Sequence, residues 1–208
     1  MLAAEEIGAV LSSGYELRGF ELKGPGPRTD AHLFAKVARA ALSMGNLRDG
    51  GHVIIGIDDG DPGAMLPGLE APDLSSWLVY DDLARKLAEY ADPPLRFDLA
   101  RRDLPTGVTV AAIQVFEFLD TPHLCAKDYP KVLRKGALYV RPRKVPETSE
   151  VASLVEMRDV IHLATEKALR AYIETVERAG LTLSTSVGKS VTPSDDERYE
   201  AERERGWS

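Results

Sequence analysis

Two adjacent carboxylates at the end of a short apolar run are the residues of this chain best placed to do chemistry. The run is Gly-Gly-His-Val-Ile-Ile-Gly-Ile-Asp-Asp, residues 50–59. Its β-branched residues do not alternate with polar ones, which is typical of a strand buried on both faces. Asp58 and Asp59 would then lie where a buried strand leaves its sheet, a common place for ligand binding in mixed α/β folds. Carboxylates at that point can bind a metal ion or a polar ligand without burying their charge in the core.

A second group of charged residues lies between Lys127 and Lys144, where seven basic side chains accompany one acid, Asp128. The basic residues are Lys127, Lys131, Arg134, Lys135, Arg141, Arg143 and Lys144. Two interpretations fit this run: a solvated loop and strand face, or a surface that binds the phosphates of a nucleic acid. Because the whole chain has a net charge of −7 at pH 7, such a surface would be a local patch.

Regular elements must position both groups, and the hydrophobic pattern indicates where these elements lie. Helical spacing predicts helices over residues 3–13, from Asp30 as N-cap to Gly45, over about 75–91 and over about 149–179. Alternating or β-branched runs predict strands at 19–23, at 53–57, in an antiparallel hairpin at 95–118, and around 137–141. Gly56 interrupts its strand, which indicates the close approach of another backbone or side chain.

These elements predict an α/β (α+β) fold in which helices pack against a mixed β-sheet, followed by a long C-terminal helix. We expect one domain over residues 1–148, a helical segment over 149–180 and a polar tail over 181–208. The tail is rich in Ser, Thr, Asp, Glu and Arg and has few large apolar residues. Such a composition predicts a flexible tail, or one that orders on a protein partner.

The composition also narrows the class of protein. Hydrophobic residues make up 44% of the chain and charged residues 28%, as in globular proteins. No apolar run reaches the roughly 18 residues that a membrane-spanning helix needs. The single cysteine, Cys125, leaves no internal disulfide and is typical of a reducing compartment, so we expect a cytoplasmic protein without membrane attachment.

Short motifs follow one another in a distinctive order along the chain. They are Glu16, Phe20-Glu21-Leu22-Lys23, Asn46, Gly50-Gly51, Asp58-Asp59, Arg134-Lys135-Gly136 and Tyr139-Val140-Arg141. This order resembles that of the Schlafen-type AlbA-like domains, also called divergent AlbA or DNA-binding domains, over roughly residues 12–160. The chain departs from the family pattern at Leu22, where a phenylalanine is usual, and in the three residues that separate Asn46 from the glycine pair.

The resemblance implies a specific site. Members of the Schlafen group that cut RNA use three acidic residues, and the matching positions here are Glu16, Glu21 and Asp59. Three carboxylates would hold Mg²⁺ or Mn²⁺ at a phosphodiester, where the metal polarises a phosphoryl oxygen and lowers the pKa of an attacking water. Lys23, on the same strand face as Glu21, would pair with that acid or stabilise charge in the transition state.

Ordinary structural roles account for the same residues. Glu21 and Lys23 would form a surface ion pair, Asp58 and Asp59 would cap a turn at Gly60, and Glu16 would lie in solvent. The spacing also sets a geometric condition for a shared site. Because side chains alternate along a strand, two acids five residues apart converge only if Glu16 sits in a loop or the chain kinks.

Three functions therefore remain open from the sequence. The first is a nucleic-acid-binding protein that acts as a metal-dependent endoribonuclease on structured RNA such as tRNA, with RNA favoured over DNA as the ligand. The second is a DNA- or RNA-binding regulator without catalysis, and the third is a protein-interaction module that uses the tail or the long helix. Mammalian Schlafen proteins pair two such lobes around a groove, so a single lobe predicts a homodimer, with the 149–179 helix supplying an apolar face.

Overall fold

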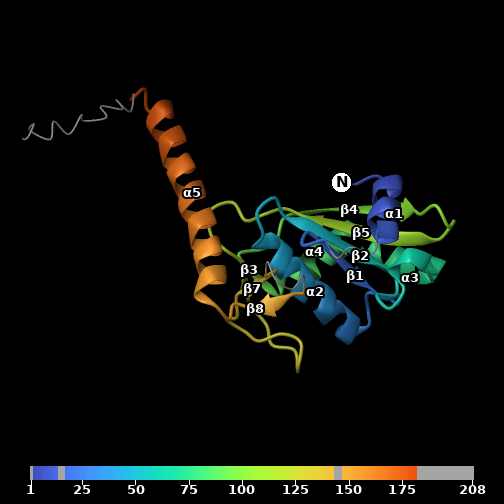
Figure 1. Cartoon of the computed structure of the whole chain (residues 1–208). Helices are drawn as coiled ribbons and strands as arrows, with labels where there is room; N and C mark the ends of the chain where they lie inside the picture. The colour runs from blue at the N-terminus through green and yellow to red at the C-terminus, as the bar shows by residue number, and fades with distance from the viewer. Residues whose placement is uncertain (1, 14–16, 143–146, 182–208) are drawn as a thin grey trace, which may run out of the picture. The chain divides into compact units, whose positions relative to one another are not determined.

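The computed structural model describes residues 2–13, 17–142 and 147–181 of the protein (Figure 1). The chain divides into two compact units, Met1–Ala168 and Leu169–Ser208. The first unit contains the sheet and the charged residues discussed above. In the second unit the described residues are the end of helix α5 (Leu154–Arg178) and the three residues that follow it. The predicted tail, from residue 182 onward, lies outside the described residues.

A four-stranded mixed sheet lies at the centre of the first unit, in the order β1-β2-β5-β4. Strand β1 pairs with β2 in parallel, β2 with β5 antiparallel, and β5 with β4 antiparallel. The strands are β1 Phe20–Lys23, β2 Gly51–Ile55, β4 Phe97–Asp103 and β5 Thr109–Val115. The mixed α/β fold is therefore confirmed, together with the predicted hairpin at 95–118.

Two short strand pairs lie outside this sheet. One joins β3 to β6 and the other joins β7 to β8 in antiparallel register. Their bounds are β3 Ala91–Asp92, β6 Leu124–Cys125, β7 Tyr139–Val140 and β8 Ser149–Glu150. The strand predicted around 137–141 thus has only two residues, and the helix predicted from residue 149 begins at Leu154, after a short strand.

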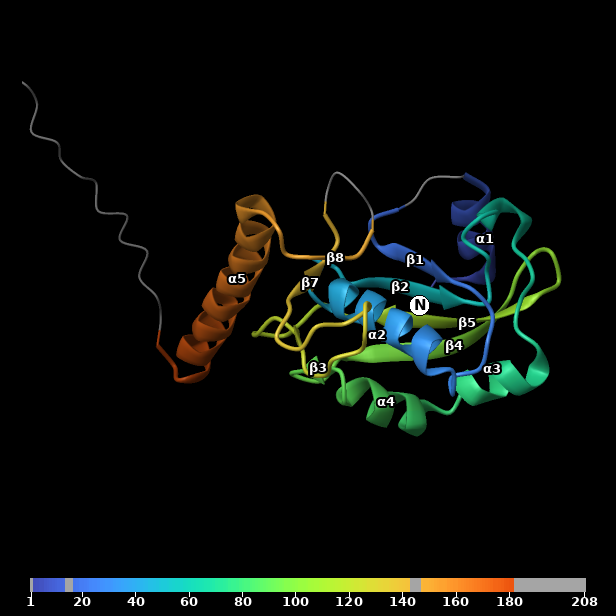
Figure 2. The same cartoon turned by 90° about the horizontal axis from the view of Figure 1, so that it is seen from below.

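Helices cover both faces of the sheet (Figure 2). The apolar side chains of β2 alternate between the two faces, so each face contributes to its own hydrophobic cluster with the helices that cover it. Val53 and Ile55 pack in the larger cluster with α2, α3 and α4, whereas Ile54 packs in the smaller cluster with α1. The helices are α1 Ala4–Ser13, α2 Ala31–Gly45, α3 Ala71–Trp77 and α4 Tyr80–Ala88, with a 3-10 turn, η1, at Pro62–Ala64. The prediction of a strand buried on both faces is confirmed.

The single helix predicted over 75–91 is wrong, because the chain forms α3 and α4 with a break at Leu78 and Val79. Val79 adopts an extended conformation and serves as the N-cap of α4. Trp77, which is fully buried, explains the break: its ring stacks on Phe34 with centroids 6.0 Å apart, and its Nε1 donates to the Gly26 carbonyl at 2.8 Å. This anchoring fixes the end of α3 independently of the helix that follows.

Two glycines of the 50–59 stretch are required by close contacts. Gly50 has φ +71°, and a Cβ there would lie 2.1 Å from the Val115 carbonyl oxygen. Gly56 has φ +117°, and a Cβ there would lie 2.9 Å from Leu69 Cγ. Both positions therefore combine a left-handed backbone with tight packing that other residues do not tolerate. The close approach predicted at Gly56 is confirmed.

The first half of α5 belongs to the first unit and packs against its other elements through a small buried cluster. Val160 and Leu163 from the helix contact Phe118 and Val140 there. Elsewhere the helix exposes large apolar side chains, including Leu154 and Ile161. None of the helices in the described part of the chain combines the length and apolar character required to cross a membrane.

Candidate functional site

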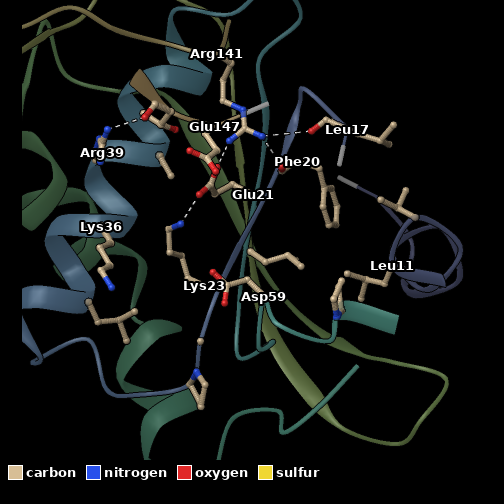
Figure 3. Close-up of a pocket in the computed structure, with 18 of the residues that line it drawn as sticks. Leu11, Leu17, Phe20, Glu21, Lys23, Lys36, Arg39, Asp59, Arg141 and Glu147 are labelled. Carbon is tan, nitrogen blue, oxygen red and sulfur yellow. Dashed lines mark hydrogen bonds and ion pairs between the residues drawn. The ribbon is translucent and has the colours of Figure 1, made fainter. Parts of the chain in front are cut away.

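A cavity of about 670 Å³ lies beside β1 and α2 in the first unit (Figure 3). Its walls come from α1, β1 and α2, from the loop after β2, and from Arg141, Glu147 and Thr148. Pockets that bind small ligands measure roughly 300 to 1,000 Å³, so the volume suits a ligand the size of a nucleotide. Its charged lining residues are Glu21, Lys23, Asp30, Lys36, Arg39, Asp59, Arg141 and Glu147.

All four residues of β1 line the cavity, and alternation along the strand places Glu21 and Lys23 together on one of its two faces. Phe20 and Leu22 pack with the smaller hydrophobic cluster on the α1 side. Glu21 lies beside Val53 of β2 in parallel register, so the acidic strand is the direct neighbour of the Gly-Gly strand. Glu21 and Asp59 line the same cavity, as the sequence interpretation requires.

The Glu21 carboxylate is bound by two cations, one on each oxygen. Lys23 Nζ contacts Oε1, and Arg141 Nη1 contacts Oε2 (Figure 3). The three side chains are largely buried, with exposed fractions of 18% for Glu21, 16% for Lys23 and 1% for Arg141. The pairing of Glu21 with Lys23 therefore occurs, but within a buried network that also includes Arg141 rather than as a surface ion pair.

Arg141 also covers the outer edge of the N-terminal strand. Its Nε donates to the Arg18 carbonyl at 2.8 Å, and its Nη2 donates to the Phe20 carbonyl at 2.9 Å. In return Arg18 Nε donates to the Arg141 carbonyl at 2.6 Å. These bonds satisfy backbone groups that a sheet edge leaves unpaired. These partners hold the Arg141 guanidinium inside the protein, so it does not lie on a solvated face, while its predicted contact with nucleic acid stays a prediction.

Asn46 fixes the segment that carries Arg141. It is the C-cap of α2 and is buried, and its Nδ2 donates to the carbonyls of His123 at 2.9 Å and Tyr139 at 3.0 Å. Its Oδ1 accepts a hydrogen bond from the His123 backbone N–H at 2.8 Å. One side chain thus ties the end of α2 to β7, and Arg141 follows β7 directly. This gives a physical reason for an asparagine at the position that the motif order singles out.

Helix α2 carries a stripe of basic residues that the sequence analysis did not identify. His32, Lys36 and Arg39 recur at intervals of four and three residues, which places them on one helical face, and all three line the cavity. The apolar face of this helix is the one that the hydrophobic pattern indicates. The spacing of its basic residues on the opposite face was the signal that would have revealed them.

Lys36 and Arg39 have donors available for a ligand. Lys36 is exposed and makes no hydrogen bond or ion pair within residues 2–13, 17–142 and 147–181. Arg39 Nη2 donates to the Thr148 carbonyl at 2.6 Å, and its guanidinium lies 5.5 Å from the centre of the Tyr139 ring. The Arg39 Nε is buried and has no partner among the described residues. A buried donor of this kind favours a ligand that brings an acceptor.

The two aspartates after β2 differ in their surroundings. Asp58 Oδ1 accepts a hydrogen bond from the Gly60 N–H at 2.9 Å, so it caps the turn as the structural interpretation predicted. Asp59 is exposed, lines the cavity and makes no hydrogen bond or ion pair in the described part of the chain. The Asp59 carboxylate is therefore available to a ligand.

The charges around the cavity change the ionisation of its side chains. The pKa of Lys23 is lowered to about 8, mainly by burial; the Asp59 charge opposes this shift, and the positive charges of Lys36 and Arg39 contribute to it. Hydrogen bonds from the backbone N–H groups of Leu33 and His32 lower the pKa of Asp30, the N-cap of α2. Lys23 thus loses its charge close to physiological pH, while Asp30 remains a carboxylate.

Two of the described carboxylates of the cavity already have other partners. Both oxygens of Glu21 contact cations, and Asp30 is engaged in capping α2. Among the described residues no three His, Cys, Asp or Glu side chains form a group able to hold a metal. The third predicted ligand, Glu16, lies outside the described residues. Binding of Mg²⁺ or Mn²⁺ by Glu16, Glu21 and Asp59 therefore stays a prediction.

Among the described residues of the basic run, Lys127, Lys131, Arg134 and Lys135 do not line the cavity. Lys127 pairs with Glu89 at 2.6 Å, and Arg134 pairs with Glu150. Lys131 and Lys135 are exposed, whereas the predicted contacts Arg143 and Lys144 lie outside the described residues. The ring of Tyr129, which belongs to this run, lies 6.0 Å from the His32 ring. That contact connects the run to the basic stripe of α2.

Comparisons with known proteins do not assign a family to the chain. No family model and no curated protein matches it. A similar solved structure is the DIP2311 protein from Corynebacterium diphtheriae, with 19% identity, a TM-score of 0.46 and coverage of 71% of this chain and 26% of that one. This chain thus spans about a quarter of that protein.

A second similar structure is the N-terminal domain of a protein from Nitrosomonas europaea that is named as related to the ATP-dependent DNA helicase RecG. Identity is 19% and the TM-score is 0.43, and the match covers 65% of this chain and 88% of that one. Similarities of this degree identify neither family nor activity. The resemblance to Schlafen-type AlbA-like domains therefore stays a prediction, and the function is inferred from the cavity.

Proposed function

We propose that the protein binds nucleic acid and holds a phosphate group in the cavity beside β1. Lys36 and Arg39 contact the phosphate, and Lys23 adds positive charge from the facing strand. The observation that carries this proposal is the spare donor capacity of the α2 stripe. Lys36 has no partner in the described part of the chain, and the Arg39 Nε is buried without one. Phosphate oxygens accept hydrogen bonds from such cations with high preference.

The acids of the cavity do not prevent an anionic ligand from binding, because two of them already have partners that offset their negative charge. Glu21 is paired with Lys23 and Arg141, and Asp30 accepts hydrogen bonds from the first turn of α2. The α2 stripe also continues to the exposed basic run through the contact between His32 and Tyr129. A chain of phosphates, rather than a single small anion, would use both surfaces.

Fluorescence anisotropy with labelled tRNA, single-stranded RNA and duplex DNA tests this proposal. Reversing the charge of the exposed stripe residue, Lys36→Glu, is expected to weaken binding about tenfold or more at low salt, because it removes a phosphate contact and adds repulsion. The matched control is Arg85→Glu on α4, where the arginine is 75% exposed and pairs with Asp82. Equal loss of affinity in both variants would contradict a role for the cavity.

Cleavage is a second candidate function, favoured by the position of Glu21 and Asp59 in one cavity. The same nucleic acids are incubated with and without Mn²⁺ and analysed on a gel, with Glu21→Ala and Asp59→Ala as variants. Cleavage that both substitutions abolish would support a nuclease with the predicted acids. Cleavage by the parent protein that persists in both variants would exclude this cavity as the catalytic site.

A further inference from the structure

The cavity offers both positive and negative groups to a ligand. The α2 stripe supplies cations on one side, while Asp59 projects from the loop after β2 on another (Figure 3). Asp59 lies near enough to Lys23 for its charge to oppose the lowering of the Lys23 pKa. A site for phosphate alone gains nothing from an open carboxylate, because the two anions repel. A ligand that pairs a phosphate with a hydrogen-bond donor would use both.

An unpaired nucleotide is a ligand of this kind. Its phosphate and the edge of its base belong to one flexible unit, whereas a duplex presents phosphates outward and keeps the Watson–Crick edges of its bases paired. The cavity volume of about 670 Å³ accommodates one nucleotide but not a double helix. A carboxylate accepts hydrogen bonds from exocyclic amino groups, as Asp and Glu do with N4 of cytosine, and repels the carbonyl oxygen of uracil or thymine.

We propose that the cavity takes a single unpaired nucleotide whose base carries an exocyclic amino group. The phosphate lies on Lys36 and Arg39, and Asp59 accepts the amino hydrogen of the base. This inference rests on the proposed function and specifies its ligand: single-stranded nucleic acid, with cytosine preferred over uracil. Asp59 is then a specificity-determining residue, and its interaction with the base is independent of any metal.

Oligocytidine and oligouridine of equal length test the inference, because their bases differ in carrying an amino group or an oxygen at C4. Anisotropy is measured near pH 7 with both oligomers and with a duplex. The parent protein is expected to bind oligocytidine roughly tenfold more tightly than oligouridine, and single strands more tightly than the duplex. Asp59→Asn is expected to reduce the preference for cytosine to less than about twofold, because an amide both donates and accepts hydrogen bonds.

The control is Asp61→Asn, which makes the same chemical change two residues away. Asp61 precedes the η1 turn, makes no capping hydrogen bond with its side chain and does not line the cavity. Equal affinity of the parent for the two oligomers, or a preference that survives in Asp59→Asn, would overturn the inference. Binding of the duplex as tightly as of single strands would also overturn it and leave the proposed function intact. Failure to bind all three nucleic acids would instead contradict the proposed function.

Discussion

Lys23 is the cavity residue whose charge responds most directly to pH. Its ammonium group contacts the Glu21 carboxylate, and its side chain is 16% exposed. Burial is the main reason that its pKa is lowered to about 8 from an ordinary value of 10.5. Below that pKa the cavity has an additional positive charge beside Lys36 and Arg39. Above it the charge disappears, and the cavity becomes less attractive to a phosphate.

We therefore expect nucleic-acid affinity to fall as the pH rises from about 7 to about 9. The variant Lys23→Arg keeps its charge over this range, so its affinity should change much less. Anisotropy titrations at constant ionic strength measure both curves. An equally steep fall in Lys23→Arg would show that another group controls the response.

The same shift affects stability with a defined sign. The folded protein releases the Lys23 proton at lower pH than the unfolded chain does, so between about pH 8 and 10.5 the unfolded state binds more protons at this site. The contribution of Lys23 to the free energy of unfolding therefore increases with pH across this window. The free energies of unfolding of the parent and of Lys23→Met, measured in urea, should therefore approach each other as the pH rises from 8 to 10.5.

Arg141 acts as a buried structural cation rather than as a surface contact. Replacing it by methionine would remove one cation from Glu21 and leave the carbonyls of Arg18 and Phe20 without a donor. We expect Arg141→Met to lower the free energy of unfolding by about 3 to 5 kcal/mol. Urea denaturation measures the change, and the double variant Glu21→Gln/Arg141→Met should recover part of it. A loss below about 1 kcal/mol would contradict the structural role.

At the scale of elements, α2 combines three tasks in one helix. Phe34 and Ala41 pack in the core, Lys36 and Arg39 line the cavity, and Asn46 at the C-terminal end joins the helix to β7. The cavity therefore depends on how this helix is held at its end. A substitution at Asn46 would therefore shift Arg141 and β1, although Asn46 itself does not line the cavity.

We expect Asn46→Ala to lower the free energy of unfolding by about 2 to 4 kcal/mol, because it leaves two buried carbonyls and one N–H without their partner. Ser43→Ala, also on α2 and buried, is a suitable comparison, since its hydroxyl bonds the Ala40 carbonyl of its own helix and the Thr148 hydroxyl but no group of β7. Denaturant unfolding of both variants gives the two losses. Equal and small losses would contradict the positioning role of Asn46.

The sequence predicted the elements whose signals are local. The buried strand predicted at 53–57, the hairpin at 95–118 and the Asp30 cap all depend on neighbouring residues, and the structure contains each of them, with the strand displaced to Gly51–Ile55. The break between α3 and α4 depends on Trp77 reaching Gly26 across the fold, so no local pattern indicated it.

The residues of the candidate site also fall into those with a local sequence signal and those that depend on contacts between distant parts of the chain. Alternation along β1 correctly placed Glu21 and Lys23 on one face, and Asp59 in the same cavity was expected from the adjacent strands. The burial of Arg141 against Glu21, 120 residues earlier in the chain, could not be predicted from the basic run alone. The basic stripe of α2 could have been predicted locally, because His32, Lys36 and Arg39 are spaced by four and three residues on the face opposite the apolar one.

At the scale of the whole molecule, the predicted homodimer stays a proposal. Helix α5 exposes Leu154, Val155 and Ile161 by 86%, 64% and 53%, which provides apolar surface near its start. Light scattering should give twice the mass of the 22.7 kDa chain if a second copy covers this surface. In that case Ile161→Glu should shift the mass toward that of the monomer. A parent protein that elutes as a monomer at all concentrations would contradict the dimer.

Charge distribution across the molecule determines how nucleic-acid binding should respond to salt. The chain has a net charge of −7, so binding requires a local concentration of cations such as the α2 stripe. Each phosphate contact contributes roughly 0.7 to the slope of log K against log salt concentration for a single strand. Removing one contact therefore leaves a measurable change in slope.

The most direct test of the account is this salt slope in three proteins: the parent, Lys36→Gln and the exposed control Arg85→Gln. Anisotropy with a single-stranded oligonucleotide over a series of salt concentrations gives each value. We predict that Lys36→Gln lowers the magnitude of the slope by roughly 0.7, while Arg85→Gln leaves it unchanged. Equal slopes in all three proteins would contradict the claim that the cavity beside β1 binds a phosphate.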